Sequence, residues 1–226
     1  MLGHIPETQF DLRFRVGPIP VRVHPIFWLT GVFICWGSYQ QDPPMLFIAV
    51  GAVFLSVLVH ELGHATMTRL FGWPSEIVLG FFGGYATTAR TSTGRNLAVL
   101  IAGPGAGFAL AAVAFVAVLA LNAQENVPER VRTALGFLLF INIAWSLLNL
   151  IPVLPLDGGQ IAREIMVWFN PRRGEQWAML LSAVIGAVTA AAGYFWLHQM
   201  FLAIFFGLFA YQNFAGWQMQ RRGGWS

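Results

Sequence analysis

The chain has 226 residues, of which 57% are hydrophobic and 10% are charged, whereas an ordinary globular protein carries roughly 25% charged residues. With a mean hydropathy of +0.63, it has more apolar surface than soluble cores of this length can bury, which excludes a disordered chain. Its thirteen basic residues are all arginine and its formal charge is only +3, so there is no basic stripe for nucleic acid. The composition predicts an integral membrane protein whose partner is the lipid bilayer.

Six apolar runs approach the roughly 20 residues that a helix needs to cross about 30 Å of hydrocarbon. They lie at residues 25–39, 45–70, 96–121, 133–151, 175–197 and 199–217, and the first of them is short. In the third run, Gly103 and Gly107 form a G-x-x-x-G pattern that predicts close helix packing. The predicted fold class is an all-α polytopic membrane protein of about six transmembrane helices, forming one membrane-embedded domain over residues 1–226.

The arginines predict how the spans are oriented. With six spans, Arg130 and Arg132 lie on one side of the membrane and the other eleven arginines lie on the opposite side. Because positive charge is retained on the cytoplasmic side, we expect both termini there, as a segment over residues 1–24 and a tail over residues 218–226.

The second run contains the sequence HELGH, an H-E-x-x-H motif in an otherwise almost purely apolar helix. His60 and His64 are four residues apart, so both imidazoles project from one helix face and can bind a single metal ion. Glu61 is rotated to one side, where it can act on a water molecule without being a ligand. The competing explanations are that the motif arose by chance or that the histidines only pack against neighbouring helices. However, ionisable groups inside a membrane helix are costly and functional by default. His60 is fifteen residues after Met45, which places it ~22 Å into the membrane, nearer the arginine-rich side.

Two histidines do not complete a tetrahedral zinc site, so a third protein ligand is expected. The candidates are Asp157 in NLIPVLPLDGGQ, Glu164 and Glu76. Asp157 is favoured because the fourth span runs toward the same face as the second, and Pro152 and Pro155 interrupt its helix at the membrane edge. The two glycines that follow allow the chain to turn closely around a site. An ordinary turn before an amphipathic helix is the alternative explanation.

Residues 76–90 are rich in strand formers and too short to span the membrane as a helix. Gly83 and Gly84 give a turn signal, so the segment predicts a small re-entrant β-hairpin after the second span. The edge of such a hairpin can add a substrate as an extra strand. A purely structural hairpin or an interfacial loop is equally compatible with the pattern.

The two motifs, HELGH and NLIPVLPLDGG about ninety residues later, resemble those of the site-two protease family of intramembrane zinc metalloproteases. The resemblance covers residues 55–161. It implies a bacterial or archaeal cell membrane and a membrane-associated sheet near the predicted hairpin. No PDZ-like insertion and no CBS-type tail is visible, so a minimal core is expected. The implied site has one zinc ion bound by His60, His64 and Asp157, with Glu61 as catalytic base and Asn149 holding the substrate or the oxyanion.

The function that follows is hydrolysis of a peptide bond in or near the transmembrane segment of a membrane-bound protein, such as an anti-sigma factor or a tethered transcription regulator. Glu61 would deprotonate the attacking water, and Asn149 could donate a hydrogen bond to the oxyanion. The alternative is a non-proteolytic membrane protein that binds or transports a divalent metal. A transporter should have polar residues along a path between the two faces, whereas here they gather near one face. A pure carrier also has no need of a base that is not a ligand.

Overall fold

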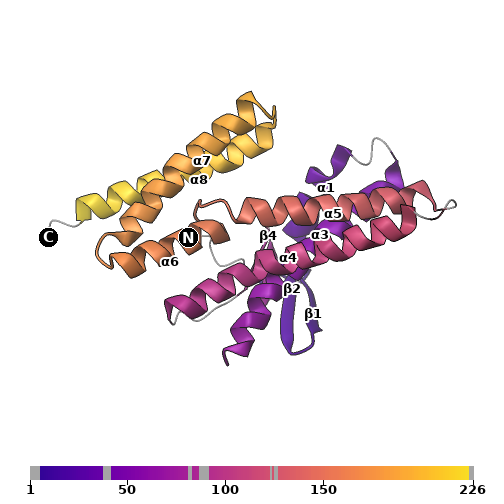
Figure 1. Cartoon of the computed structure of the whole chain (residues 1–226), viewed down its shortest axis with the longest axis horizontal. Coiled ribbons are helices and arrows are strands. Elements are labelled where there is room, and N and C mark those ends of the chain that lie inside the picture. The colour runs from indigo at the N-terminus through magenta and orange to yellow at the C-terminus, as the bar shows by residue number, and fades with distance from the viewer. Residues whose placement is uncertain are drawn as a thin grey trace. The chain divides into compact units, whose positions relative to one another are not determined.

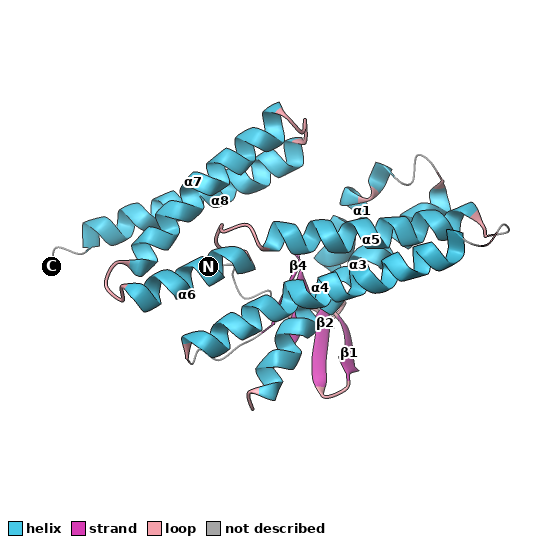
Figure 2. Cartoon of the chain, viewed as in Figure 1, coloured by secondary structure: helices cyan, strands magenta, loops and turns pink. Residues whose placement is uncertain are grey.

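The structure is a computed structural model that describes residues 6–37, 42–80, 83–86, 92–122, 124 and 127–223. Its contacts divide the chain into two compact units, one of residues 1–90 and 101–147, the other of residues 91–100 and 148–226. Most of the described residues are helical, as Figures 1 and 2 show. Among the described residues, five helices are long and apolar enough to cross a membrane. They are α3 (Pro43–Leu70), α4 (Thr93–Asn122), α5 (Glu129–Asn149), α7 (Gly174–Phe195) and α8 (Met200–Gly223).

These long helices expose large apolar side chains. Phe47, Val113, Phe140, Val184 and Ile204 are each more than half exposed. Many exposed large apolar side chains on helices of this length are unfavourable in water but match the hydrocarbon of a bilayer. The chain is therefore a multi-pass membrane protein, and the predicted spans at residues 45–70, 96–121, 133–151, 175–197 and 199–217 correspond to the five long helices.

The remaining predicted span, at residues 25–39, is longer than the helix described there, and residues 38–39 lie outside the described part of the chain. Helix α1 covers Pro25–Ile34, ten residues, and rises about 15 Å, half of what a crossing requires. The His24 side chain accepts a hydrogen bond from the Ile26 amide and caps the helix start. Phe27 and Gly31 of α1 are buried inside the protein. Leu29 and Phe33 are 66% and 72% exposed, so only part of the run packs against protein, and hydropathy does not distinguish such packing from contact with lipid.

A four-stranded sheet accompanies the helices of the first unit. Its strands are β1 (Leu12–Val16), β2 (Ile19–Val23), β3 (Ile77–Gly80) and β4 (Gly83–Ala86), in the order β1-β2-β3-β4. The pairs β1–β2 and β3–β4 are antiparallel, whereas β2 and β3 are parallel, with Val21 opposite Ile77. Beside the helices in Figure 2, β1 and β2 form the magenta ribbon of the N-terminal segment.

The predicted hairpin after the second span is confirmed by β3 and β4, but its turn lies elsewhere. Gly83 pairs with Gly80 and Gly84 pairs with Leu79, so both predicted turn residues lie within β4. The residues between the two strands, 81–82, lie outside the described part of the chain, as do residues 87–90 of the predicted segment. The prediction also lacked β1 and β2, so the residues expected to be only an N-terminal segment are half of this sheet.

The sheet packs against α3 and thereby supports the helix that carries HELGH. Val21 and Val23 of β2 point to one face of the sheet and are at most 2% exposed. They join Ile77 and Leu79 of β3 in a core with Val57, Leu58 and Ala65 of α3. These three α3 residues flank the motif, so the sheet is attached to α3 on both sides of the histidines.

The second unit contains α6 (Asp157–Phe169), α7 and α8. Helix α6 contacts α7, and α7 contacts α8 along much of their length, as the orange and yellow ribbons of Figure 1 show. Val153, Phe206 and Phe209 form its buried core. Val153 belongs to the segment between α5 and α6, so this segment is packed into the unit as part of its core.

Candidate metal centre

The two histidines of HELGH lie side by side on α3, as their spacing predicts. His60 and His64 are 3% and 7% exposed, and their Nε2 atoms are 3.1 Å apart. Two nitrogens bound to one tetrahedral zinc ion at 2.0–2.1 Å would be about 3.3 Å apart. The separation of the imidazole pair is close to this value and is also within hydrogen-bond distance.

Glu61 follows His60 on the same helix turn and is also buried, at 5% exposure. Three ionisable side chains are thus buried within five residues of a membrane-spanning helix. Burying such groups is costly unless they are paired, bound to a metal or used in chemistry. The burial of these three residues makes them a candidate reactive site.

A polar contact one turn before His60 ties α3 to α5. The Asn142 Nδ2 donates a hydrogen bond of 2.9 Å to the Ser56 Oγ, and each residue is 1% exposed. The same Nδ2 also donates a hydrogen bond of 2.8 Å to the Leu138 carbonyl. This buried link fixes the distance between the two helices near the histidine pair.

Asp157 is the first residue of α6, in the second unit, and is 7% exposed. The segment that leads to it is held at Leu154 from two helices. The Leu154 amide donates to the Ser182 Oγ of α7 at 3.0 Å, and the Leu154 carbonyl accepts from the Asn213 Nδ2 of α8 at 2.7 Å. The Gln160 Nε2 donates to the Pro155 carbonyl at 3.0 Å. The carboxylate of Asp157 is therefore presented from an anchored segment.

The two glycines after Asp157 allow this segment to lie against the first turn of α6, as the sequence predicts. A Cβ atom at Gly158 would overlap the backbone of Leu150 and Ile151, and one at Gly159 would overlap the backbone of Val153 and Leu154. Only a residue without a side chain permits such close approach of two backbones. The pattern LDGG thus has a packing reason in addition to its turn chemistry.

The other predicted site residues have different surroundings. Asn149 is the last residue of α5 and is half-buried. The Glu164 carboxylate accepts from the Asn96 Nδ2 at 3.0 Å and from Arg163 at 3.2 Å, so this alternative ligand is engaged within the second unit. Glu76, the remaining alternative, directly precedes β3.

Ser182 and Asn213 were missed by the sequence reasoning. Each is a buried polar residue in a predicted membrane span, and polar residues are rare there without a partner. That signal was present in the sequence, but nothing in it indicates that the partner is the backbone of Leu154.

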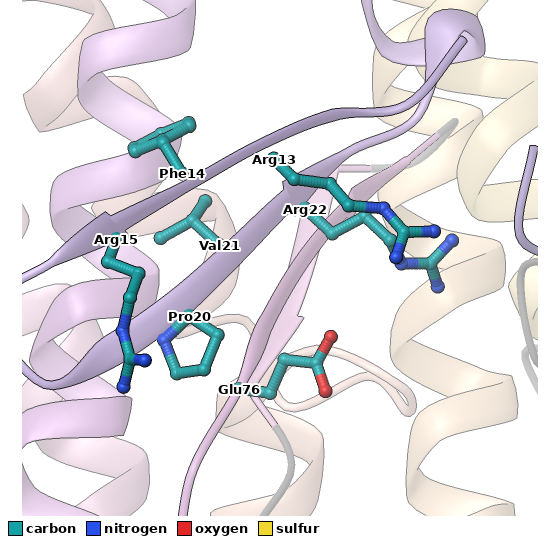
Figure 3. A pocket seen from close by; sticks show the side chains of 7 residues that line it. All are labelled: Arg13, Phe14, Arg15, Pro20, Val21, Arg22 and Glu76. Atoms are coloured by element: carbon teal, nitrogen blue, oxygen red, sulfur yellow. The ribbon is translucent and has the colours of Figure 1, made fainter. Parts of the chain in front are cut away.

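A pocket of about 300 Å³ lies on the sheet and includes Arg13, Arg22 and Glu76 in its lining (Figure 3). The Arg13 guanidinium is 2.7 Å from the Glu7 carboxylate, and that of Arg22 is 2.9 Å from the Asp11 carboxylate. Each of these two arginines is thus paired with a carboxylate, whereas Arg15, which also lines the pocket, donates to the Pro18 carbonyl. Of the candidate ligands, Glu76 lines this pocket, whereas His60, His64 and Asp157 do not, and we assign the pocket no ligand.

A multi-pass membrane protein with a buried H-E-x-x-H pair belongs to the class of membrane-embedded metalloproteins. The model of peptidase family M50 matches residues 48–134 and 123–193 of the chain. The chain therefore belongs to peptidase family M50, and its resemblance to the site-two proteases is confirmed.

Relatives and solved structures agree with this assignment. The chain is 35% identical over 172 residues to a putative zinc metalloprotease of Synechocystis, covering 68% of this chain and 44% of the relative. It is 30% identical over 154 residues to a zinc metalloprotease of Methanocaldococcus jannaschii, with the same two coverages. The chain thus spans less than half the length of these curated relatives. The fold is similar to the site-2 protease structure from Methanocaldococcus jannaschii, with a TM-score of 0.64 and 22% identity, covering 90% of this chain and 95% of that one.

Zinc is the metal in the names of both curated relatives. Imidazole nitrogen and carboxylate oxygen are ordinary zinc ligands, and the His60–His64 separation of 3.1 Å suits a tetrahedral ion. The donor set of this chain therefore fits zinc as its cofactor.

Proposed function

We propose that the chain is an intramembrane zinc endopeptidase that hydrolyses a peptide bond in or near the transmembrane segment of a membrane-bound protein. The observation that carries the proposal is the pair of buried imidazoles, 3.1 Å apart, beside a buried glutamate in a membrane-spanning helix. Membership of peptidase family M50 supports the same reaction. The clustering of ionisable groups on one helix favours it over metal transport.

His60, His64 and Asp157 are the proposed ligands. Each is buried and offers one ligand atom. Among the described residues, no other group of three His, Cys, Asp or Glu side chains brings its ligand atoms close enough together to hold one ion. The engagement of Glu164 by Arg163 and Asn96 supports Asp157 over that alternative. Zinc, when bound, would supply Lewis-acid polarisation of the scissile carbonyl.

Glu61 is the proposed general base and then general acid. Its carboxylate would accept a proton from the attacking water and return it to the leaving amine. Its burial keeps bulk water from competing for that proton. Asn149 is proposed to donate a side-chain N–H to the substrate carbonyl oxygen as negative charge develops there.

The site is proposed to face the cytoplasmic side. Arg69 lies in the last turn of α3, nine residues after His60, and positive charge beside a span marks the cytoplasmic side. The expectation that both termini are cytoplasmic requires residues 25–41 to bring the chain across the membrane once. It remains a prediction, because α1 is ten residues long.

The proposed substrate is the transmembrane segment of an anti-sigma factor or another tethered regulator, held in extended form. A peptide bond in a helix is shielded by backbone hydrogen bonds, so the segment must unwind before hydrolysis. Strand β4 ends the order of the described sheet and pairs with β3. Its other edge is proposed to receive the unwound substrate as an added strand.

The test is cleavage of a single-span reporter co-reconstituted with the chain in proteoliposomes, with bound zinc measured in parallel. Glu61→Gln should keep its zinc and lose cleavage. Glu129→Gln, an exposed change in the first turn of α5, is the matched control and should cleave normally. Zinc that crosses the bilayer while no reporter is cut would refute the protease and favour a carrier.

A further inference from the structure

Helix α4 touches the HELGH segment through a face of small residues. A Cβ atom at Gly63 of α3 would overlap the Ala102 carbonyl and the Ala106 side chain. The backbones of α3 and α4 are therefore in direct contact beside the histidine pair. Small residues at a membrane helix interface allow this close approach.

Gly103, the next residue of α4, lies against the ring of His64. A Cβ atom at Gly103 would overlap Nε2, Cε1 and Cδ2 of the His64 imidazole, and these are the three atoms nearest to it. The overlap is with a flat, buried ring that is 7% exposed. An alanine here would force the ring, or the helix behind it, to move.

Two nearby glycines of α4 differ in this respect. A Cβ atom at Gly105 would have nothing within 4 Å, and one at Gly107 would overlap the Ser146 Oγ of α5. The three positions share one helix and one residue type. Of these three glycines, Gly103 is the one in contact with a histidine of the motif.

We infer that Gly103 is a positioning residue for His64. The missing side chain lets the imidazole lie with its Nε2 3.1 Å from that of His60. The G-x-x-x-G pattern of residues 103–107 thus does more than bring helices together, because its first glycine shapes the space of a metal-binding side chain. The metal part of this inference rests on the proposed function, whereas the contact between Gly103 and His64 does not.

The first experiment compares zinc affinity by chelator competition in detergent micelles for Gly103→Ala, Gly105→Ala and Gly107→Ala. Residues that orient a metal ligand typically change affinity by 10–100-fold, and we expect that loss for Gly103→Ala. Gly105→Ala should keep the parental affinity. Gly107→Ala should unfold at a lower temperature yet bind zinc normally when folded. The visible spectrum of the cobalt-substituted protein should change in Gly103→Ala alone, because it reports ligand geometry.

The second experiment uses metal-free protein and tests the contact itself through a double-mutant cycle with His64→Ala. Gly103→Ala should lower the melting temperature when His64 is present and have little effect when the ring has been removed. If Gly103→Ala does not fold alone, the double variant should restore folding. An equal loss in both backgrounds would overturn the inference, since the overlap would then not involve the ring.

The two experiments separate the possible failures. A coupled cycle with unchanged zinc affinity in Gly103→Ala would overturn the positioning role while leaving the contact intact. If the parental chain binds no zinc at all, the proposed function fails, and the cycle still decides whether Gly103 sets the ring position.

Discussion

The segment that presents Asp157 depends on a hydrogen bond that a single substitution can remove. The Asn213 Nδ2 donates to the Leu154 carbonyl at 2.7 Å, and Asn213 is 8% exposed. Asn213→Leu keeps a similar side-chain size but leaves this carbonyl without its α8 donor. A buried acceptor that loses its partner costs about 1–3 kcal/mol.

This free energy converts to a measurable melting shift. At about 2–4 °C per kcal/mol for a chain of this size, Asn213→Leu should lower the melting temperature by about 2–12 °C in detergent micelles. Zinc affinity should fall as well, because Asp157 is three residues beyond Leu154. The amide of Leu154 keeps its bond to Ser182, so the segment should loosen without unfolding completely.

Ser146→Ala is the control. Within the described residues, the Ser146 Oγ is buried with no hydrogen-bond partner, so its removal should change the melting temperature little. A shift for Asn213→Leu no larger than that for Ser146→Ala, with unchanged zinc affinity, would refute the claim that Asn213 holds the segment.

Two further predictions concern the start of α6 and the N-terminal strands. Gly158→Ala should lower both folded yield and zinc content, because a Cβ atom there overlaps the Leu150 and Ile151 carbonyls; size-exclusion profiles and metal analysis measure the two. The pKa of Asp11 is lowered by the hydrogen bond from the Thr8 hydroxyl and by the Arg22 guanidinium. Because this carboxyl has a lower pKa folded than unfolded, its stabilisation is complete above its ordinary pKa of about 3.9 and is lost as the pH falls below it. The melting-temperature difference between the parental chain and Asp11→Asn should therefore be constant from pH 8 to about 5 and shrink below pH 4; a constant difference down to pH 2 would contradict this assignment.

The long spans were predictable because their apolar runs exceed what any soluble core of this size accommodates. Helices α3 and α4 begin and end within three residues of the predicted runs. The run at residues 25–39 was predicted as a full-length span, whereas α1 has ten residues, because burial of Phe27 against protein and burial in lipid leave the same apolar pattern. Strands β1 and β2 were missed although they form a local hairpin with Val16 opposite Ile19, and their place in the larger sheet depends on the pairing of β2 with β3, more than fifty residues away. Such long-range pairing leaves no periodic signal of its own.

The histidine pair and its neighbouring glutamate could be identified from HELGH alone, since helix periodicity determines that residues four apart share a face. Local spacing and hydropathy thus determined the membrane class, the long spans and the chemistry of the motif. The tertiary structure decided which residues meet. Gly103 lies beside His64, Asn142 donates a hydrogen bond to Ser56, and Ser182 and Asn213 bond to the backbone of Leu154. These contacts join helices far apart in the sequence, and only the packed fold determines which side chain faces which.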